Sequence, residues 1–316
     1  MHPLIPYFEQ PTFEIGPLAI HGFGILVAIG FWVGGELAQR RAVRFTGEDA
    51  ASERINRVVG WLVFGAIVGG HLGHMFLYES GLVVDALQAV LASPAYQAAD
   101  AQGHGWDVIR VQGWGDDLNP GPIQAAADAW LHKLPRVWDG LSSFGGFLLC
   151  VPLTVLFFRR EKLPYWPYGD ALAWGFGAGF GIGRLGCFWA HDHPGAQTNF
   201  WLGVEGICLD DRGARIPAPI ACHDMGFYEA LWVFGILGVF FLVGRKPRPP
   251  GTYLGLLALL YGPARIVMDF LRSNHGPDVR YLGLTPAQYG SLLVSALGVW
   301  ILVRARGKEP LPAALG

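Results

Sequence analysis

Charged residues are scarce in this sequence, and their scarcity excludes several classes of protein. Only 15% of its 316 residues are Asp, Glu, Lys or Arg, against about 25% in a typical soluble protein. The 23 basic and 25 acidic residues nearly balance, which leaves no basic excess for binding nucleic acid. Hydrophobic residues make up 52%, too many for a disordered chain. Four cysteines are too few for a disulfide-rich scaffold.

Glycine and long apolar segments are abundant instead. The 45 glycines and the mean hydropathy of +0.34 are typical of packed membrane helices, because small residues let helix backbones approach closely. A helix that crosses a bilayer needs about 20 mostly apolar residues. Seven segments approach this length, at 18–38, 58–78, 142–158, 168–189, 226–244, 252–271 and 284–303. We therefore expect residues 1–316 to form one all-α polytopic membrane domain.

Basic residues lie in alternate connecting segments and predict the orientation of the chain. Lys and Arg cluster at residues 40–57, 159–162, 245–248 and 304–308, whereas residues 1–17 have none. Connecting segments rich in Lys and Arg stay in the cytoplasm. The pattern therefore predicts an N-terminus outside the cell membrane and a C-terminus in the cytoplasm.

Two long segments fall on the outer side. Residues 79–141 predict an arm in which a helix is followed by an irregular loop at 101–123. Residues 190–225 are rich in Pro, Gly and Asp and predict a small folded head. The head carries Cys208 and Cys222 on the oxidising side of the membrane. A disulfide between them and a pair of free thiols are both compatible with the sequence.

Placing an ionisable side chain in a bilayer costs free energy, so ionisable residues within the predicted spans indicate a functional site. Arg184 ends the fourth span, and Tyr261, Arg265, Asp269 and Arg272 recur at helical spacing along the sixth. The guanidinium group of arginine binds phosphate oxygens through two hydrogen bonds. The phosphate available in a membrane belongs to a lipid headgroup. An internal ion pair between Arg265 and Asp269 is the structural alternative.

These motifs resemble, in their order and spacing, those of the prolipoprotein diacylglyceryl transferase family. The resemblance rests on HGFGILVAIGFWVG, GGHLGHMFLY, RVWDGLSSFGGFLL, GRLGCFWAHDHPG, HDMGFYEAL, GRKPRPPGTYLGLLALLYGPARIVMDFLR and GLTPAQYGSLL. It implies transfer of a diacylglyceryl group from phosphatidylglycerol to the lipobox cysteine of prolipoproteins, in the bacterial inner membrane with the active site facing the periplasm. The implied partners are that phospholipid, prolipoproteins and membrane lipids, without nucleic acid and without a cofactor.

The resemblance also assigns site residues by matching position. Arg184 and Arg265 would hold the phosphate of the donor lipid and stabilise charge on the leaving group. Tyr78 and Tyr261 would line the same site. The other candidates for substrate binding are Asp192, Gly195, Glu229 and His21.

The sequence departs from the family pattern at the catalytic base. Phe144 takes the place of the family's histidine, and Cys187 takes the place of a signature asparagine. A base is still needed, because a free cysteine thiol has a pKa of about 8.5. His191 and His193 follow Arg184 closely and are the candidate catalytic bases, with structural or headgroup contacts as the alternative.

Two other functions remain open. The histidines supply enough ligands for a transition metal, which would make the protein a metal-dependent phospholipid-processing enzyme. The candidate ligands are His71, His74, His191, His193 and His223. Loss of the family's histidine also fits an inactive protein that binds lipid or lipoprotein. Sensitivity to a chelator separates the metal-dependent function from the other two.

Overall fold

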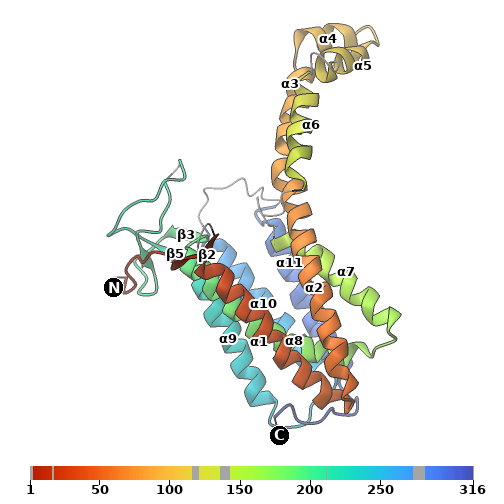
Figure 1. Ribbon diagram of the computed structural model, residues 1–316, viewed down its shortest axis with the longest axis vertical. Helices are drawn as coiled ribbons and strands as arrows, with labels where there is room; N and C mark the ends of the chain where they lie inside the picture. Colours follow the sequence, from red (N-terminus) through yellow and green to blue (C-terminus); the bar gives the residue numbers. More distant parts are fainter. Residues whose placement is uncertain are drawn as a thin grey trace. The chain divides into compact units, whose positions relative to one another are not determined.

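Long helices occupy all seven positions that hydropathy predicts, as Figure 1 shows for the computed structural model. The structure describes residues 3–15, 18–115, 121–135, 143–210, 212–272 and 282–315. The long helices are α1 (Gly22–Thr46), α2 (Ala50–His74), α7 (Ser143–Arg160), α8 (Tyr165–Ala190), α9 (Met225–Val243), α10 (Thr252–Phe270) and α11 (Pro286–Ala305). Among the described residues, α1, α2, α9, α10 and α11 are long and apolar enough to cross a membrane. A polytopic membrane protein is thereby confirmed, and seven crossings stay a prediction.

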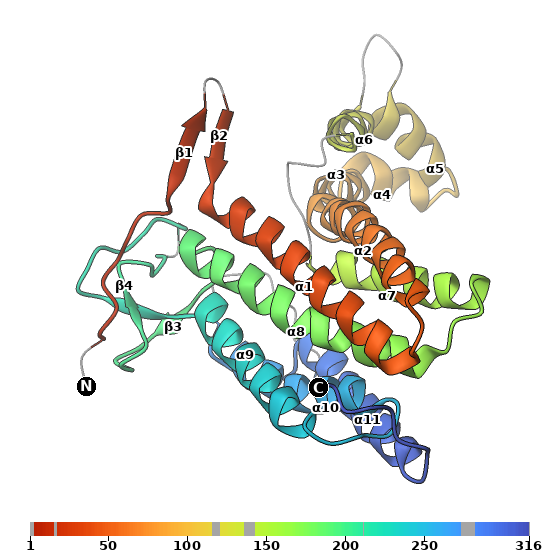
Figure 2. The ribbon, with the colours of Figure 1, turned by 60° about the horizontal axis from the view of Figure 1, so that its bottom comes forward.

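Short strands correct the prediction of an all-α fold. They are β1 (Thr12–Ile15), β2 (Leu18–His21), β3 (Pro194–Gln197), β4 (Val204–Glu205) and β5 (Ala221–Asp224). β1 and β2 form an antiparallel hairpin that runs directly into α1, as Figure 2 shows. The other three form an antiparallel sheet in the order β3-β5-β4. Runs of two to four residues are too short to show the alternation that reveals a strand.

The chain divides into two compact units. The first comprises Met1–Asn56 and Pro164–Gly316, and the second comprises Arg57–Leu163. The first unit holds the head and the helices α1, α8, α9, α10 and α11, whereas the second holds most of α2, the arm and α7.

Glycines allow α1 and α8 to pack backbone to backbone in the first unit. A Cβ on Gly30 would lie 2.5 Å from the carbonyl oxygen of Gly179, and a Cβ on Gly34 would lie 2.7 Å from that of Gly175. The pairs are four residues apart on both helices, so they follow the same faces. Figure 2 shows α1 beside α8 and α8 beside α9. The abundance of glycine therefore serves close helix packing, as the sequence predicts.

Buried carboxylates fix the starts of α9 and α10. Asp224 ends β5 and accepts a hydrogen bond from the backbone N–H of Phe227 at 2.9 Å, which caps α9. Asp170 of α8 accepts from the N–H groups of Gly251 and Leu254, at 2.8 and 2.9 Å, and so caps α10 from a neighbouring helix. The carboxylates satisfy backbone donors that the helix itself leaves unpaired.

The head has a small core of its own around a disulfide. Cys208 and Cys222 are bonded, with 5.4 Å between their Cα atoms, so the disulfide alternative is confirmed. Val204 and Ile207 are buried against it. The N-terminal segment joins the head, because the N–H of Glu205 donates to the carbonyl oxygen of Ile5 at 3.0 Å. The segment therefore has a disulfide and buried residues of its own.

The arm in the second unit is more helical than the sequence indicates. Its elements are η1 (Met75–Glu79), α3 (Gly81–Leu91), α4 (Pro94–Asp100), α5 (Gly105–Val108), η2 (Ile109–Trp114) and α6 (Pro122–Lys133). The prediction of an irregular loop at 101–123 is wrong for 105–114 and for 122–123, while 116–120 lie outside the described residues. Val90, Ile109 and Ile123 form a buried core there, which stabilises helix despite the Gly-rich composition. α3 and α6 pack side by side, as Figure 1 shows.

Candidate functional site

A buried carboxylate joins three helices of the first unit. Glu229 of α9 forms an ion pair with Arg184 of α8 and accepts a hydrogen bond from the hydroxyl of Tyr261 of α10. Glu229 is 2% exposed, and the side chain of Arg184 is 11% exposed. A buried charge is stable only when it is paired and hydrogen-bonded. The predicted residues Arg184, Glu229 and Tyr261 therefore form one cluster.

The guanidinium of Arg184 makes further contacts around this pair. Its Nη1 donates to the sulfur of Cys187 at 3.3 Å, and its Cζ lies 5.8 Å from the centre of the Phe180 ring. Its Nε is buried and has no hydrogen-bond partner among the described residues. One buried N–H of this guanidinium is therefore unsatisfied among the described residues.

Arg265 has a different environment from Arg184. It follows Tyr261 by one helical turn and is half-buried, with no ion pair to any described residue. The expected alternative, a pair with Asp269, is not formed there. Asp269 instead accepts from the Thr285 hydroxyl at 2.6 Å and from Nη1 of Arg272 at 3.4 Å. The charge of Arg184 is therefore compensated by Glu229, whereas no described residue forms an ion pair with Arg265.

Three polar side chains gather where α8 ends. One potential ligand atom from each of Cys187, Asp192 and His193 lies within 4.8 Å of the other two. Nδ1 of His193 lies 2.5 Å from Oδ1 of Asp192. Burial disfavours a charge on the imidazole, but hydrogen bonds to Asp192 and Cys187 outweigh burial and raise the pKa of His193 to about 9. This cluster contacts Arg184 through the sulfur of Cys187.

His191 has a structural setting that differs from that of His193. It caps α8 in the left-handed region, with φ of 49°, which turns the chain toward the head. Its Nδ1 lies 3.1 Å from Oδ2 of Asp224, and both side chains are 1% exposed. The rings of Phe8 and Phe188 pack against it, with centroids 4.5 and 5.7 Å away. His191 therefore links the end of α8 to the start of α9.

Gly195 allows a close approach that another residue would prevent. A Cβ at this position would collide with the backbone carbonyl oxygen of Leu271 and would lie 2.9 Å from the Cβ of His223. The neighbouring N–H of Ala196 donates to the same carbonyl at 2.8 Å. The predicted residue Gly195 therefore joins β3 to the end of α10.

The remaining predicted residues of the first unit lie apart from Arg184. Nδ1 of His223 lies 2.8 Å from the hydroxyl of Tyr228, and burial lowers the pKa of His223. His21 is exposed at the start of α1, where its Nδ1 lies 3.1 Å from the hydroxyl of Thr12. Neither contact involves the cluster around Glu229.

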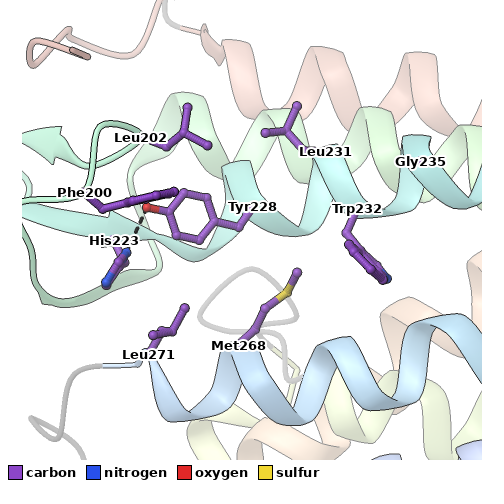
Figure 3. Close-up of a pocket in the computed structure, with 9 residues that line it drawn as sticks. All are labelled: Phe200, Leu202, His223, Tyr228, Leu231, Trp232, Gly235, Met268 and Leu271. Carbon is purple, nitrogen blue, oxygen red and sulfur yellow. Dashed lines mark hydrogen bonds between the residues drawn. The ribbon is translucent and has the colours of Figure 1, made fainter. Parts of the chain in front are cut away.

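An apolar cavity of about 500 Å³ lies between the head, α9 and α10. It is lined by Phe200, Leu202, His223, Tyr228, Leu231, Trp232, Gly235, Met268 and Leu271. Figure 3 shows Phe200, Tyr228 and His223 together at one end and Trp232 toward the other. His223 and Tyr228 supply its polar groups, and the remaining surface suits a hydrocarbon group.

The second unit contains the other predicted residues. Nε2 of His71 lies 2.8 Å from the carbonyl oxygen of Leu134, and Nε2 of His74 lies 3.5 Å from Oε1 of Glu79. The side chains of Tyr78 and Phe144 lie outside the described residues.

Among the described residues of the first unit, the predicted metal-binding histidines His191, His193 and His223 do not form one group. Within the first unit, His191, His193 and His223 each contact a different side chain, respectively Asp224, Asp192 and Tyr228. The cluster that could hold a metal there shares one histidine with the predicted set, His193.

Cys187 is the residue that reasoning from the sequence alone missed. The sequence favours a buried small residue, and Cys187 is indeed 7% exposed. Its position in the sequence could have identified it. Cys187 replaces the signature asparagine, three residues after Arg184 and five before Asp192. A residue three positions away lies on the same helix face, so its contact with Arg184 follows from the spacing.

The chain is similar to known proteins along almost its whole length. The model of the prolipoprotein diacylglyceryl transferase family matches residues 10–304. A phosphatidylglycerol–prolipoprotein diacylglyceryl transferase of Nitratidesulfovibrio vulgaris is 29% identical, with 98% of each chain covered. Proteins of the same name from Solidesulfovibrio magneticus and Ectopseudomonas mendocina are 28% and 26% identical, with 95% and 98% of each chain covered. The chain therefore belongs to the prolipoprotein diacylglyceryl transferase family.

Proposed function

We propose that this protein transfers a diacylglyceryl group from phosphatidylglycerol to the lipobox cysteine thiol of prolipoproteins. The observation that carries the proposal is the buried cluster of Arg184, Glu229 and Tyr261, with Arg265, which has no ion pair to a described residue, one turn beyond Tyr261. These residues match positions of a family whose relatives cover 98% of the chain and carry that activity in their names.

Arg184 and Arg265 have different proposed roles in binding the phosphate. We assign the positive charge to Arg265 and a hydrogen bond to the guanidinium of Arg184, which Glu229 holds in place. The thiolate attacks the glyceryl carbon, the carbon–oxygen bond to the phosphate breaks, and the electron pair leaves with glycerol phosphate. Fixed donors stabilise the charge that develops on this leaving group without reorganising.

The thiol is deprotonated next to this phosphate site. The cluster of Cys187, Asp192 and His193 contacts Arg184, which supports a role beside the leaving group. His193 is 37% exposed, whereas His191 is enclosed by aromatic rings, so His193 is the histidine that an incoming thiol reaches. Because the pKa of His193 is raised to about 9, its imidazole holds a proton at neutral pH and would stabilise the thiolate.

The apolar cavity supplies room for the lipid chains. Its lining by Leu231, Trp232 and Met268 lies on the two helices that carry Glu229 and Tyr261. A cavity of about 500 Å³ holds part of one acyl chain, and burying its methylene groups stabilises the complex by about 0.8 kcal/mol for each group.

We also propose that the protein lies in the bacterial inner membrane with its head in the periplasm. The disulfide between Cys208 and Cys222 supports this side, because disulfides persist in the oxidising periplasm. The basic end of α1 supports a cytoplasmic C-terminus, because Arg41 and Arg44 donate to the carbonyl oxygens of Ala314 and Ala313.

A transfer assay with purified protein, phosphatidylglycerol and a lipobox peptide tests the function by the mass of the peptide. Arg184→Ala and Arg265→Gln should each lower transfer by about 100- to 1,000-fold while the protein stays in the membrane, because each removes a donor to the leaving group. Arg245→Gln is the matched control, since Arg245 is exposed beyond α9. Wild-type transfer by either site variant contradicts the phosphate assignment.

The assay also separates the proposed enzyme from an inactive lipid-binding protein. The relative from Ectopseudomonas mendocina serves as the positive control for the lipid and the peptide. Protein that binds phosphatidylglycerol but yields no peptide adduct, while the relative does, overturns the proposed activity.

A further inference from the structure

Cys187, Asp192 and His193 present three different metal-binding groups at the end of α8. A thiol, a carboxylate and an imidazole each place one ligand atom within 4.8 Å of the others. Cys187 is buried, whereas the side chains of Asp192 and His193 are 39% and 37% exposed. The buried Cys187 therefore fixes the cluster to α8, whereas Asp192 and His193 are accessible to an incoming group.

This donor set suits zinc. Zinc takes Cys, His and Asp ligands in tetrahedral sites, and catalytic sites use three protein ligands and leave the fourth position open. A thiol that coordinates the ion is deprotonated outright. The open position would therefore take a second thiol from the substrate and hold it as a thiolate.

The charges around the site balance when a divalent ion is present. The carboxylate of Glu229 compensates Arg184, and the guanidinium of Arg184 already donates to the sulfur of Cys187. A thiolate at Cys187 and the carboxylate of Asp192 compensate the two charges of the zinc ion. The remaining charges are the substrate thiolate and Arg265, which faces the departing phosphate. Balanced charge matters here because buried charges without partners are costly.

The ligand atoms would have to move locally to take the ion, because they lie within 4.8 Å of one another but not at tetrahedral spacing. Two ligands at about 2.0 Å from a tetrahedral ion are roughly 3.3 Å apart, whereas Nδ1 of His193 and Oδ1 of Asp192 are 2.5 Å apart. The ion would therefore replace this hydrogen bond, and the side chains of the two exposed residues would separate by less than about 1 Å.

Resting on the proposed function, we infer that Cys187, Asp192 and His193 bind a zinc ion that holds the substrate thiolate for attack on the lipid. The thiol releases its proton to water on binding. Its sulfur then forms the bond to the glyceryl carbon as the bond from that carbon to the phosphate oxygen breaks. The zinc ion would do the work of the family's histidine, whose position is occupied by Phe144.

Measuring the zinc content of the purified protein tests the inference without relying on activity. Wild-type protein should contain about one zinc ion per chain by mass spectrometry, and Cys187→Asn, which carries the family's asparagine, should contain roughly a tenth of that or less. Cys150→Ala is the matched control, because Cys150 is the other free cysteine and lies in α7. Cobalt added to metal-free protein should give a thiolate absorption band in wild type and in Cys150→Ala but not in Cys187→Asn.

The outcomes separate this inference from the proposed function. Wild-type protein that contains no zinc and gives no thiolate band with cobalt overturns the zinc site. Undiminished transfer by metal-free protein also overturns it and leaves the transferase standing. Zinc held through Cys187 in a protein that makes no peptide adduct supports the metal site and overturns the transferase. His193→Gln should lose zinc too while eluting as the same folded species in gel filtration.

Discussion

At the residue scale, Glu229 holds the site together. Its carboxylate contacts a cation on α8 and a hydroxyl on α10, so three helices depend on one buried side chain. The position of Glu229 is predictable from the resemblance, but its two contacts are not, because they join residues on separate helices. Hydropathy places each helix in the sequence without saying which faces meet.

Replacing Glu229 by Gln should lower the stability of the protein by about 3–5 kcal/mol, because Arg184 is left buried without a counter-charge. Added phosphatidylglycerol should restore part of the loss, since its phosphate supplies the missing negative charge. The unfolding temperature in detergent measures both effects. Glu36→Gln is the control: it removes an exposed ion pair with Arg40, which contributes about 0–1 kcal/mol. An unchanged unfolding temperature for Glu229→Gln would refute this role.

His223 should make the protein less stable in mild acid. Burial lowers the pKa of His223 below 6.5, and its nearest polar group is the hydroxyl of Tyr228. Below pH 6.5 the unfolded chain binds a proton that the folded chain resists, so the free energy of unfolding falls as the pH falls. Unfolding temperatures between neutral and mildly acidic pH should show this decline, and it should be smaller in His223→Gln. Equal declines in the two proteins would assign the effect to other groups.

At the scale of elements, the close packing of α1 on α8, called the seam below, is the feature that composition predicts best. High glycine content indicates close helix packing, and Gly30 and Gly179 face each other across this seam. The strands of the head were not predictable in the same way. They are two to four residues long and lie in a Pro- and Gly-rich segment, where a disulfide and packing against the N-terminal segment stabilise them.

Gly30→Leu should prevent α1 from packing on α8. The backbone carbonyl of Gly179 would lie 2.5 Å from the new Cβ and belongs to a helix that cannot yield locally. Gly24→Leu is the matched control on the same helix, because no atom lies within 4 Å of its position. We expect Gly30→Leu to yield mostly aggregated protein in gel filtration and Gly24→Leu to elute like wild type. Normal elution of Gly30→Leu would show that the seam is looser than the structure indicates.

At the scale of the whole molecule, the pattern of basic residues predicts which side of the membrane each segment faces. Cysteines placed at Arg212 in the head and at Lys246 after α9 test it, because both residues are exposed. In intact cells, a membrane-impermeant maleimide should label Arg212→Cys and not Lys246→Cys, in a Cys150→Ala background. After membrane disruption both should be labelled. Labelling of Lys246→Cys in intact cells would reverse the proposed orientation.

The contact between Asp170 and the start of α10 cannot form as soon as Asp170 has been synthesised. Its partner Gly251 is 81 residues further along the chain. A ribosome that adds about 5–20 residues per second needs roughly 4–16 s to make that stretch. During this interval α8, which is not among the helices apolar enough to cross a membrane, carries a carboxylate whose partners do not yet exist. Asp170 therefore gains these backbone partners only after α9 has been made.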